Sequence, residues 1–101
     1  MPNMNDILRQ ANIMQRKLTK VQEDLADKEF EASSGGGMVK VVVNGRRELK
    51  SIVIDPKASD DLEMLQDLIL AAVNEGLRIA RETFEREVGA LTGNIHVPGL
   101  F

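Results

Sequence analysis

The chain has 101 residues, 43% hydrophobic and 29% charged, and carries a formal net charge of −3 at pH 7. These values predict one globular domain over residues 1–101 and exclude an intrinsically disordered chain. The absence of cysteine excludes disulfides, thiolate nucleophiles and cysteine-rich zinc sites, and it fits a cytoplasmic protein. No apolar run approaches the roughly 20 residues that span a bilayer, so we expect no membrane association.

The first predicted element is a long helix over about residues 3–27. Asn3 followed by Asp6 is typical of a capping box. Apolar residues then recur at steps of three and four, namely Met4, Ile7, Ala11, Met14, Leu18, Val21 and Leu25. Their mean spacing of about 3.5 residues is the period of a coiled-coil seam. Two interpretations fit: a helix that faces its own core, or a helix that pairs with another helix along its length.

Three consecutive glycines, Gly35, Gly36 and Gly37, follow this helix and raise the question of a phosphate-binding loop. Such a loop leads into the N-terminus of a helix, usually with a Lys-Ser or Lys-Thr pair. Here the glycines lead into Met38-Val39-Lys40-Val41, which has the composition of a strand. The glycines therefore predict a turn.

A three-stranded antiparallel sheet is predicted over about residues 28–55. Residues 28–32 alternate charged and apolar side chains, whereas residues 38–43 and 49–54 are rich in β-branched side chains. Asn44-Gly45 between the last two strands indicates a hairpin.

With the register that we expect from a short loop, Val42, Ile52 and Ile54 lie together on one face, and Val41 faces Leu49 on the other. A small sheet that is apolar on both faces needs a covering layer on each face, and the two helices of one chain need not provide both layers. We therefore expect a homodimer with Val42, Ile52 and Ile54 in its interface.

A second long helix is predicted over about residues 60–91, with Asp60 and Glu63 as its capping box and residues 92–101 as a tail. Its apolar stripe has a mean step of about 3.6 residues, which indicates a straight helix. Residues 68–73 are apolar on every side and are expected to be buried. Gly76 in the helix interior costs about 1 kcal/mol relative to Ala, which indicates close packing there. Both helices are long enough to project beyond a compact body.

No catalytic, cofactor or metal site is predicted. His96 is the only histidine and has no neighbouring nucleophile or ligand. Four acids gather before the second helix, namely Asp55, Asp60, Asp61 and Glu63, but their spacing matches no calcium loop, and acids are favoured at a helix start. We therefore expect no enzyme, no cofactor and no small-molecule substrate.

Positive charge is concentrated on the first helix. From Ile7 to Gln22 the helix contains no acid and four basic residues, Arg9, Arg16, Lys17 and Lys20, opposite the apolar seam. Two interpretations fit this face: a phosphate-binding surface, or an ordinary solvated surface. Further basic residues lie around the predicted hairpin, namely Lys40, Arg46, Arg47 and Lys50. The arginines of the second helix alternate with acids, which predicts ion pairs such as Glu82–Arg86.

Several motifs occur together in order along nearly the whole chain. They are the heptad helix from Met4, Gly35-Gly36-Gly37-Met38-Val39-Lys40-Val41, Asn44-Gly45 followed by Glu48, Ile52-Val53-Ile54-Asp55-Pro56, the segment from Leu65 to Asn74, and Pro98-Gly99-Leu100. In these motifs the sequence resembles the YbaB/EbfC family of bacterial nucleoid-associated DNA-binding proteins. It departs from the family at Gly76, where Ala is frequent, and at Asn94-Ile95-His96-Val97, where the family tail is richer in glycine.

The resemblance implies an α+β homodimer in which small sheets form a central body and paired long helices project like tweezers around duplex DNA. We therefore expect a nucleoid-associated protein that binds double-stranded DNA with modest sequence selectivity and affects chromosome organisation and gene expression. Arg9, Arg16, Lys17 and Lys20 are its predicted DNA contacts. The alternative is a protein-interaction module whose helical arms bind another protein, because the acidic balance of the chain disfavours DNA.

Overall fold

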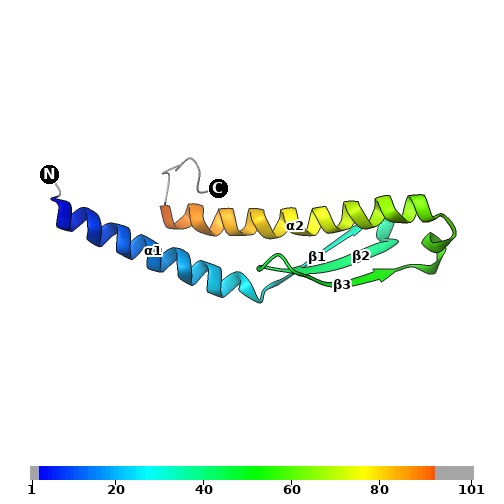
Figure 1. Ribbon diagram of the computed structural model, residues 1–101, viewed down its shortest axis with the longest axis horizontal. Helices are drawn as coiled ribbons and strands as arrows, with labels where there is room; N and C mark the ends of the chain where they lie inside the picture. Colours follow the sequence, from blue (N-terminus) through cyan, green and yellow to red (C-terminus); the bar gives the residue numbers. More distant parts are fainter. Residues whose placement is uncertain (1–2, 93–101) are drawn as a thin grey trace.

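A computed structural model describes residues 3–92 of the chain (Figure 1). The elements, in order, are α1 (Met4–Ala26), β1 (Glu29–Ser34), β2 (Val39–Asn44), β3 (Leu49–Ile54) and α2 (Leu62–Thr92), with short 3-10 segments at Gly35–Gly37 and Pro56–Asp60. This arrangement confirms the predicted α+β order of long helix, three-stranded antiparallel sheet and long helix. His96 and the predicted tail motifs lie outside the described residues.

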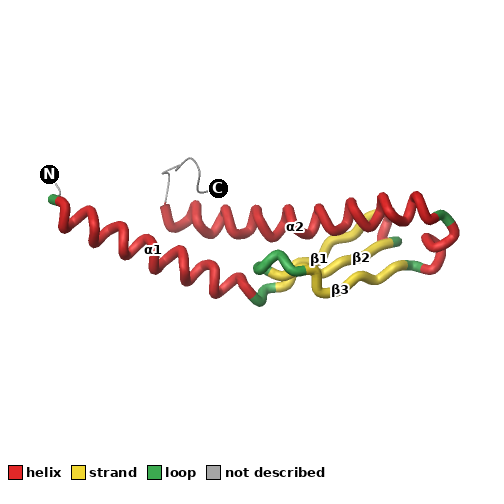
Figure 2. The backbone as a smooth tube through the Cα atoms, in the orientation of Figure 1, coloured by secondary structure: helices red, strands yellow, loops and turns green. Residues whose placement is uncertain are grey.

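The molecule is an elongated two-layer structure. Figure 1 shows α1 and the sheet following one another in one layer, with α2 running along the other. The same path in Figure 2 shows that the strands occupy only one end of the molecule. The principal extents are 67 × 22 × 16 Å, and the radius of gyration is 18.8 Å, well above the roughly 13 Å of a compact domain of about 100 residues. The expected projection of a helix beyond the sheet is therefore confirmed.

The N-terminus of α1 is closed by the predicted capping box. The Asn3 side chain accepts a hydrogen bond from the Asp6 backbone N–H at 2.9 Å, and the Asp6 carboxylate accepts one from the Asn3 N–H at 3.4 Å. These bonds satisfy two backbone donors that an α-helix leaves without intrahelical partners.

The N-terminus of α2 differs from the prediction. Asp60 belongs to the 3-10 segment, and Asp61 is the residue whose carboxylate accepts the Met64 backbone N–H at 3.0 Å. The helix therefore starts after Asp61, because the turn that follows Pro56 uses five residues before the helix can begin.

The three strands pair in the order β1-β2-β3, both pairs antiparallel. The predicted register between β2 and β3 is wrong. Val43 pairs with Leu49 and Val42 pairs with Ser51, so Lys50 is an additional residue that forms a bulge. Because side chains alternate between the two faces of a strand, this insertion reverses the faces of all residues beyond it.

The bulge separates the three residues predicted for the dimer interface. Ile52 pairs with Val41 and Ile54 pairs with Val39, so both isoleucines share the sheet face of these buried valines. Val42 points to the opposite face and is half-buried. The expectation that Val42, Ile52 and Ile54 lie on one face is therefore wrong.

The core lies between α2 and the valines of β2. Val39 and Val43 are fully buried, and small residues of α2 at intervals of four lie above them, namely Ala72, Gly76 and Ala80. A Cβ atom added to Gly76 would lie 3.3 Å from a methyl carbon of Val43. The close packing predicted at Gly76 is therefore confirmed.

The glycine cluster forms the turn between β1 and β2, as predicted. Gly35, Gly36 and Gly37 have φ values of 60°, 66° and 94°, a left-handed conformation that residues with a Cβ rarely adopt. The turn packs on α2, because the Ser34 hydroxyl donates to the Leu68 carbonyl oxygen at 2.6 Å and Gly35 lies directly beneath the Leu68 side chain.

The expectation that residues 68–73 are all buried is wrong for the single chain. Only Ala72 is buried, and the Leu70 side chain is 61% exposed. The helix packs on β1 and β2 along one face only, so the other side of this apolar segment has no cover within the described residues.

Candidate nucleic-acid interface

The helix α1 is covered by α2 only over its C-terminal half. The second half of its apolar seam is half-buried against α2, whereas Met4 and Ile7 in the first half are 68% and 50% exposed. No residue of α1 is buried. The N-terminal half of α1 is therefore a free arm that extends beyond the end of α2 (Figure 1).

The four predicted DNA contacts are all exposed on α1. Arg9 and Lys17 form no hydrogen bond or ion pair with any described residue. The Arg16 Nε donates to the Asn12 carbonyl oxygen at 3.4 Å, and the Lys20 Nζ lies 3.5 Å from an Asp24 carboxylate oxygen. These contacts are weak, since exposed ion pairs contribute at most about 1 kcal/mol.

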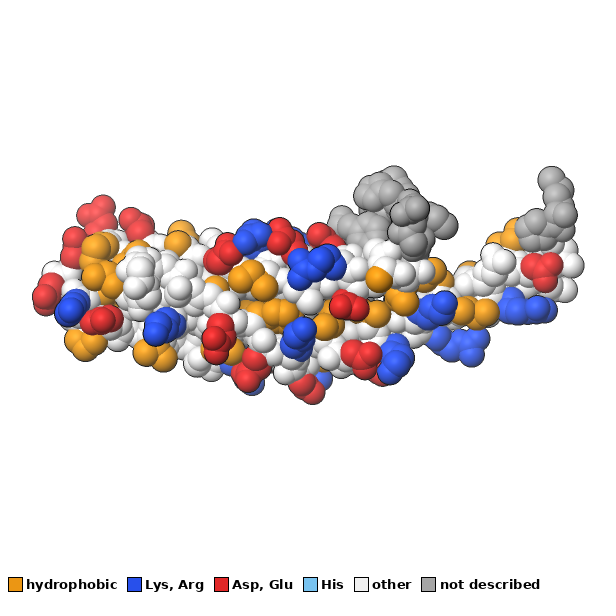
Figure 3. All heavy atoms as spheres, turned by 180° about the vertical axis from the view of Figure 1, so that it is seen from behind, with side chains coloured by type: hydrophobic (Ala, Val, Ile, Leu, Met, Phe, Trp, Pro, Cys, Tyr) orange, Lys and Arg blue, Asp and Glu red, His pale blue; other side chains and the backbone are white. Residues whose placement is uncertain are grey.

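The spacing of these side chains suits a row of phosphates. Arg9 and Lys20 are separated by about 16 Å along the helix axis, because each residue adds about 1.5 Å. One DNA strand presents a phosphate about every 3.4 Å along the duplex axis, so the row covers roughly five phosphates. Figure 3 shows Lys and Arg side chains gathered along the projecting part of the molecule that α1 forms.

The arginines of α2 are occupied by neighbouring groups. Arg78 donates to Glu75 at 2.9 Å and to Glu82 at 2.8 Å, and the hydrogen bond from Arg78 lowers the pKa of the Glu75 carboxyl below its ordinary value. The predicted Glu82–Arg86 pair is wrong, because Glu82 bonds to Arg78 and the Arg86 guanidinium donates to the Thr83 hydroxyl at 3.2 Å. The positive charge of these arginines is thus outweighed within α2, which carries six acidic and three basic residues.

The loop between β2 and β3 packs against the C-terminal end of α1. The Gly45 N–H donates to the Lys28 carbonyl oxygen at 3.1 Å, and a Cβ atom at Gly45 would lie 1.8 Å from the Leu25 carbonyl oxygen. Only glycine fits at this contact. Arg46, the next residue, forms an ion pair with Asp27 in the turn after α1.

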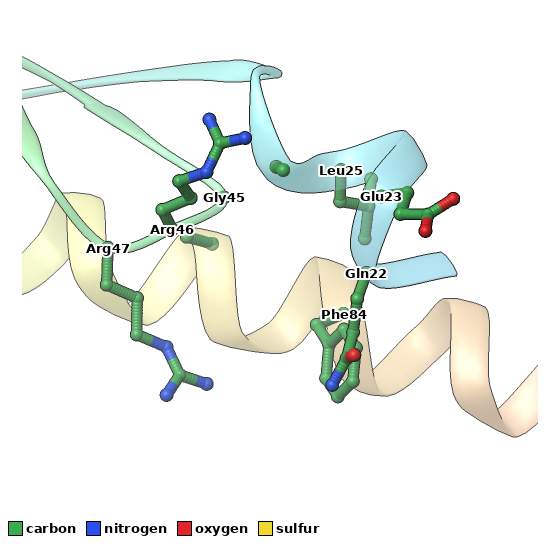
Figure 4. Close-up of a pocket in the computed structure, with 9 residues that line it drawn as sticks. Gln22, Glu23, Leu25, Gly45, Arg46, Arg47 and Phe84 are labelled. Carbon is green, nitrogen blue, oxygen red and sulfur yellow. The ribbon is translucent and has the colours of Figure 1, made fainter. Parts of the chain in front are cut away.

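A cleft of about 580 Å³ lies between this loop, the last turns of α1 and the side of α2 (Figure 4). Its lining includes Gln22, Glu23 and Leu25 from α1, Arg47 from the loop and Phe84 from α2. The sequence assigns Arg46 and Arg47 to the hairpin but gives no sign of the cleft, since the cleft depends on how the loop meets two helices.

The acidic residues before α2 act as caps. The Asp55 carboxylate accepts the Lys57 N–H at 2.9 Å, and Asp61 caps α2. Residues 3–92 contain no group of three or more acidic, histidine or cysteine side chains placed to hold a metal ion. In the same part of the chain no helix has the length and apolar character that crossing a membrane requires.

The chain matches the YbaB/EbfC DNA-binding family over residues 1–95. It belongs to the YbaB/EbfC DNA-binding family. A nucleoid-associated protein of Moorella thermoacetica is 54% identical over 101 residues, which cover 98% of this chain and 97% of that protein. A nucleoid-associated protein of Pelotomaculum thermopropionicum is 50% identical over 101 residues, with 98% and 96% covered. The resemblance in sequence motifs is thereby confirmed.

The YbaB/EbfC chain also has a structural relative. The crystal structure of the uncharacterized protein HP0035 from Helicobacter pylori matches it with a TM-score of 0.81 at 26% identity, covering 92% of this chain and 100% of that chain. The helix, three-stranded sheet and long helix are therefore shared with a solved protein. Membership places the chain in a DNA-binding family and not in a family of enzymes, as predicted.

Proposed function

We propose that this YbaB/EbfC chain binds duplex DNA as a nucleoid-associated homodimer and contacts phosphates mainly through α1. The observation that carries the proposal is the basic face of the projecting arm. Four exposed cations, Arg9, Arg16, Lys17 and Lys20, lie on a stretch without acids in a chain whose net charge is −3. The name of the family supports DNA as the ligand of this face.

The proposed binding has modest sequence selectivity. Phosphate contacts position a protein on a duplex, whereas sequence is read at the edges of the bases. The described residues contain only two aromatic side chains, Phe30, which is buried, and Phe84, which lines the cleft, so stacking on bases contributes little. A protein of this kind suits binding at many chromosomal sites, with effects on chromosome organisation and gene expression.

The proposed dimer uses the open edge of the sheet. β3 has a neighbour on one side only, and all its residues are exposed in the single chain, including Ile52 at 39% and Ile54 at 37%. Exposed edge strands and contiguous apolar surface mark interfaces. We place Ile52 and Ile54 in the interface. Val42 lies on the opposite face of the sheet, so it belongs to the interface only if the second copy also covers that face beside β3.

Two such chains would carry two projecting α1 arms on one central body. The arms are then positioned to hold a duplex from two sides, which doubles the number of phosphates contacted. Avidity of this kind strengthens binding without a new type of contact.

A titration of fluorescent duplexes of two unrelated sequences, followed by anisotropy at several salt concentrations, tests the proposal. We expect similar affinity for both duplexes and a linear fall of log affinity with log salt, with a slope of about −0.9 for each phosphate contacted. Absence of binding at low salt would overturn the proposal. The exposed apolar residues of the arm, Met4, Ile7 and Leu8, would then favour the alternative function, in which the arm binds another protein.

A further inference from the structure

Arg47 has an unusual backbone conformation in the loop between β2 and β3. Its φ is 62°, and it is the only residue other than glycine with a positive φ among residues 3–92. The left-handed region costs free energy for any residue with a Cβ, and glycine would adopt it more readily. A guanidinium therefore occupies a position at which glycine would cost less backbone free energy.

The loop that carries Arg47 is fixed by a buried side chain. The Asn44 side-chain oxygen accepts the backbone N–H groups of Arg46 at 2.9 Å and Glu48 at 3.0 Å, and its amide donates to a Glu48 carboxylate oxygen at 2.9 Å. The Arg47 N–H donates to the Asn44 carbonyl oxygen at 3.0 Å. Asn44 itself is only 4% exposed. The base of the Arg47 side chain is thus held in one place.

The Arg47 guanidinium has no internal partner. Of the seven arginines of the chain, all of which the structure describes, only Arg9 and Arg47 form no hydrogen bond or ion pair. Figure 4 shows the side chains of Arg46 and Arg47 leaving the loop in opposite directions, with Arg47 extending across the ribbon of α2 in this view. Arg46 is paired with Asp27, so Arg47 is the cation in the lining of the cleft that forms no ion pair.

A shallow groove on the flank of α1 leads to this cleft. The groove is lined by residues with hydrogen-bond donors and one acid, namely Asn12, Gln15, Arg16, Thr19, Lys20 and Glu23. Glu23 also lines the cleft that contains Arg47, so the two depressions adjoin. Amides, hydroxyls, Arg and Lys are the side chains that contact DNA phosphates and sugars.

We propose that one DNA strand follows the groove along the flank of α1 and that Arg47 binds a backbone phosphate at its end, in the cleft at the base of the arm. Gly45 touches the α1 backbone at Leu25, five residues or about 8 Å beyond Lys20. This step falls between the roughly 5 Å from Lys17 to Lys20 and the roughly 10 Å from Arg9 to Arg16, so the loop continues the row. A planar guanidinium also binds phosphate through two parallel hydrogen bonds. The inference rests on the proposed function as a DNA-binding protein.

Arg47→Gly tests the inference, because it separates fold stability from DNA binding. Removal of the side chain relieves the left-handed backbone, so the midpoint of thermal unfolding should rise by about 2–5 °C. Loss of one phosphate contact from each of the two arms should lower DNA affinity roughly 25- to 100-fold near 0.1 M salt and reduce the salt slope by about 1.8, which is about 0.9 for each contact. Asn also tolerates the left-handed backbone conformation, so Arg47→Asn should lower the DNA affinity and the salt slope by the same amounts as Arg47→Gly.

Two further variants complete the experiment. Lys57→Ala removes the same charge at the opposite end of the molecule and should leave the salt slope unchanged. Glu23→Gln removes the acid beside the proposed path and should raise affinity several-fold. An unchanged DNA affinity and salt slope in both Arg47 variants would overturn the inference, because they would show that the cleft does not bind a DNA phosphate. If the unmodified chain failed to bind DNA at low salt, the proposed function itself would fail instead.

Discussion

The four cations of α1 differ in how freely each side chain can reach a ligand. Arg9 and Lys17 have no partner among the described residues, Arg16 touches a backbone carbonyl, and Lys20 lies beside Asp24. A phosphate that binds Lys20 must therefore compete with a carboxylate. We expect Arg9 and Lys17 to contribute most to DNA binding at low salt.

Replacing any one of Arg9, Arg16, Lys17 or Lys20 with Ala should weaken binding to all duplexes alike, because phosphates carry no base identity. Each substitution removes one contact from each arm of the dimer, so it should lower the salt slope by about 1.8 in the anisotropy titration, about 0.9 for each contact. The free energy of unfolding should change by less than about 0.5 kcal/mol, since these are exposed positions away from packed residues.

Arg86→Ala is the control for this series, because the Arg86 guanidinium is engaged with Thr83 on α2. It should change affinity less than the α1 substitutions. Should all four α1 variants keep the affinity and slope of the unmodified chain while remaining folded, the basic face would be an ordinary solvated surface. The DNA contacts would then have to be sought around Lys40, Arg46, Arg47 and Lys50.

At the scale of single elements, α2 depends on small residues where it meets β2. Gly76 lies against Val43, and the contact distance of 3.3 Å for an added Cβ means that Val43 would have to shift slightly. Among residues 3–92, no heavy atom outside the neighbouring residues and the nearby α2 backbone lies within 4 Å of the corresponding position at Gly89. The two glycines therefore form a matched pair for testing helix packing.

Gly89→Ala should raise the free energy of unfolding by up to about 1 kcal/mol, because Ala favours the helix over Gly. Gly76→Ala should raise the free energy of unfolding by less, or lower it, because the added methyl group would crowd the fully buried Val43. Chemical denaturation of the two variants measures the difference. An equal increase in the free energy of unfolding for both variants would contradict this prediction, because it would mean that α2 shifts away from β2 at no cost in free energy.

The elements themselves could be predicted because their signals are local. Both long helices follow from apolar spacing, the start of α1 follows from Asn3 and Asp6, and the turn at Gly35–Gly37 follows from composition. The strand register could not be predicted, because it depends on the bulge at Lys50. One added residue reverses the faces, and nothing in the local composition marks it.

The candidate site was predictable to a similar extent. The basic face of α1 follows from helical periodicity, and all four residues are indeed exposed. The sequence does not predict that Glu82 pairs with Arg78, because Arg78 and Arg86 are both four residues from Glu82 and spacing alone does not distinguish the two pairs. The left-handed conformation of Arg47 was missed because it arises from the hydrogen bonds of Asn44.

At the scale of the whole molecule, the apolar surface of the single chain predicts assembly. Ile52 and Ile54 lie on the edge strand, and Leu62 and Leu70 of α2 are 67% and 61% exposed. Light scattering at micromolar concentration should give about twice the chain mass of 11.2 kDa. A mass near 11.2 kDa would refute the dimer.

Ile54→Asp should weaken this dimer strongly, because it would place an unpaired carboxylate against apolar neighbours at a cost of about 2 kcal/mol or more. The dissociation constant should then rise at least about 30-fold in a dilution series. Val42→Asp is the companion variant on the other face of the sheet. If Val42→Asp dissociates the dimer and Ile54→Asp does not, the interface lies on the face away from α2.

The attachment of α1 at one end makes it a lever. The helix is about 35 Å long, its C-terminal half packs on α2, and its C-terminal end is fixed by the contact of Gly45 with Leu25 and by the pairing of Arg46 with Asp27. A rotation of about 10° at that attachment would displace the far tip by roughly 6 Å, more than the rise between successive phosphates along a DNA strand. The accuracy with which the arm meets a duplex therefore depends on how α2 and the hairpin loop hold the C-terminal half of α1, some distance from the free tip of the arm.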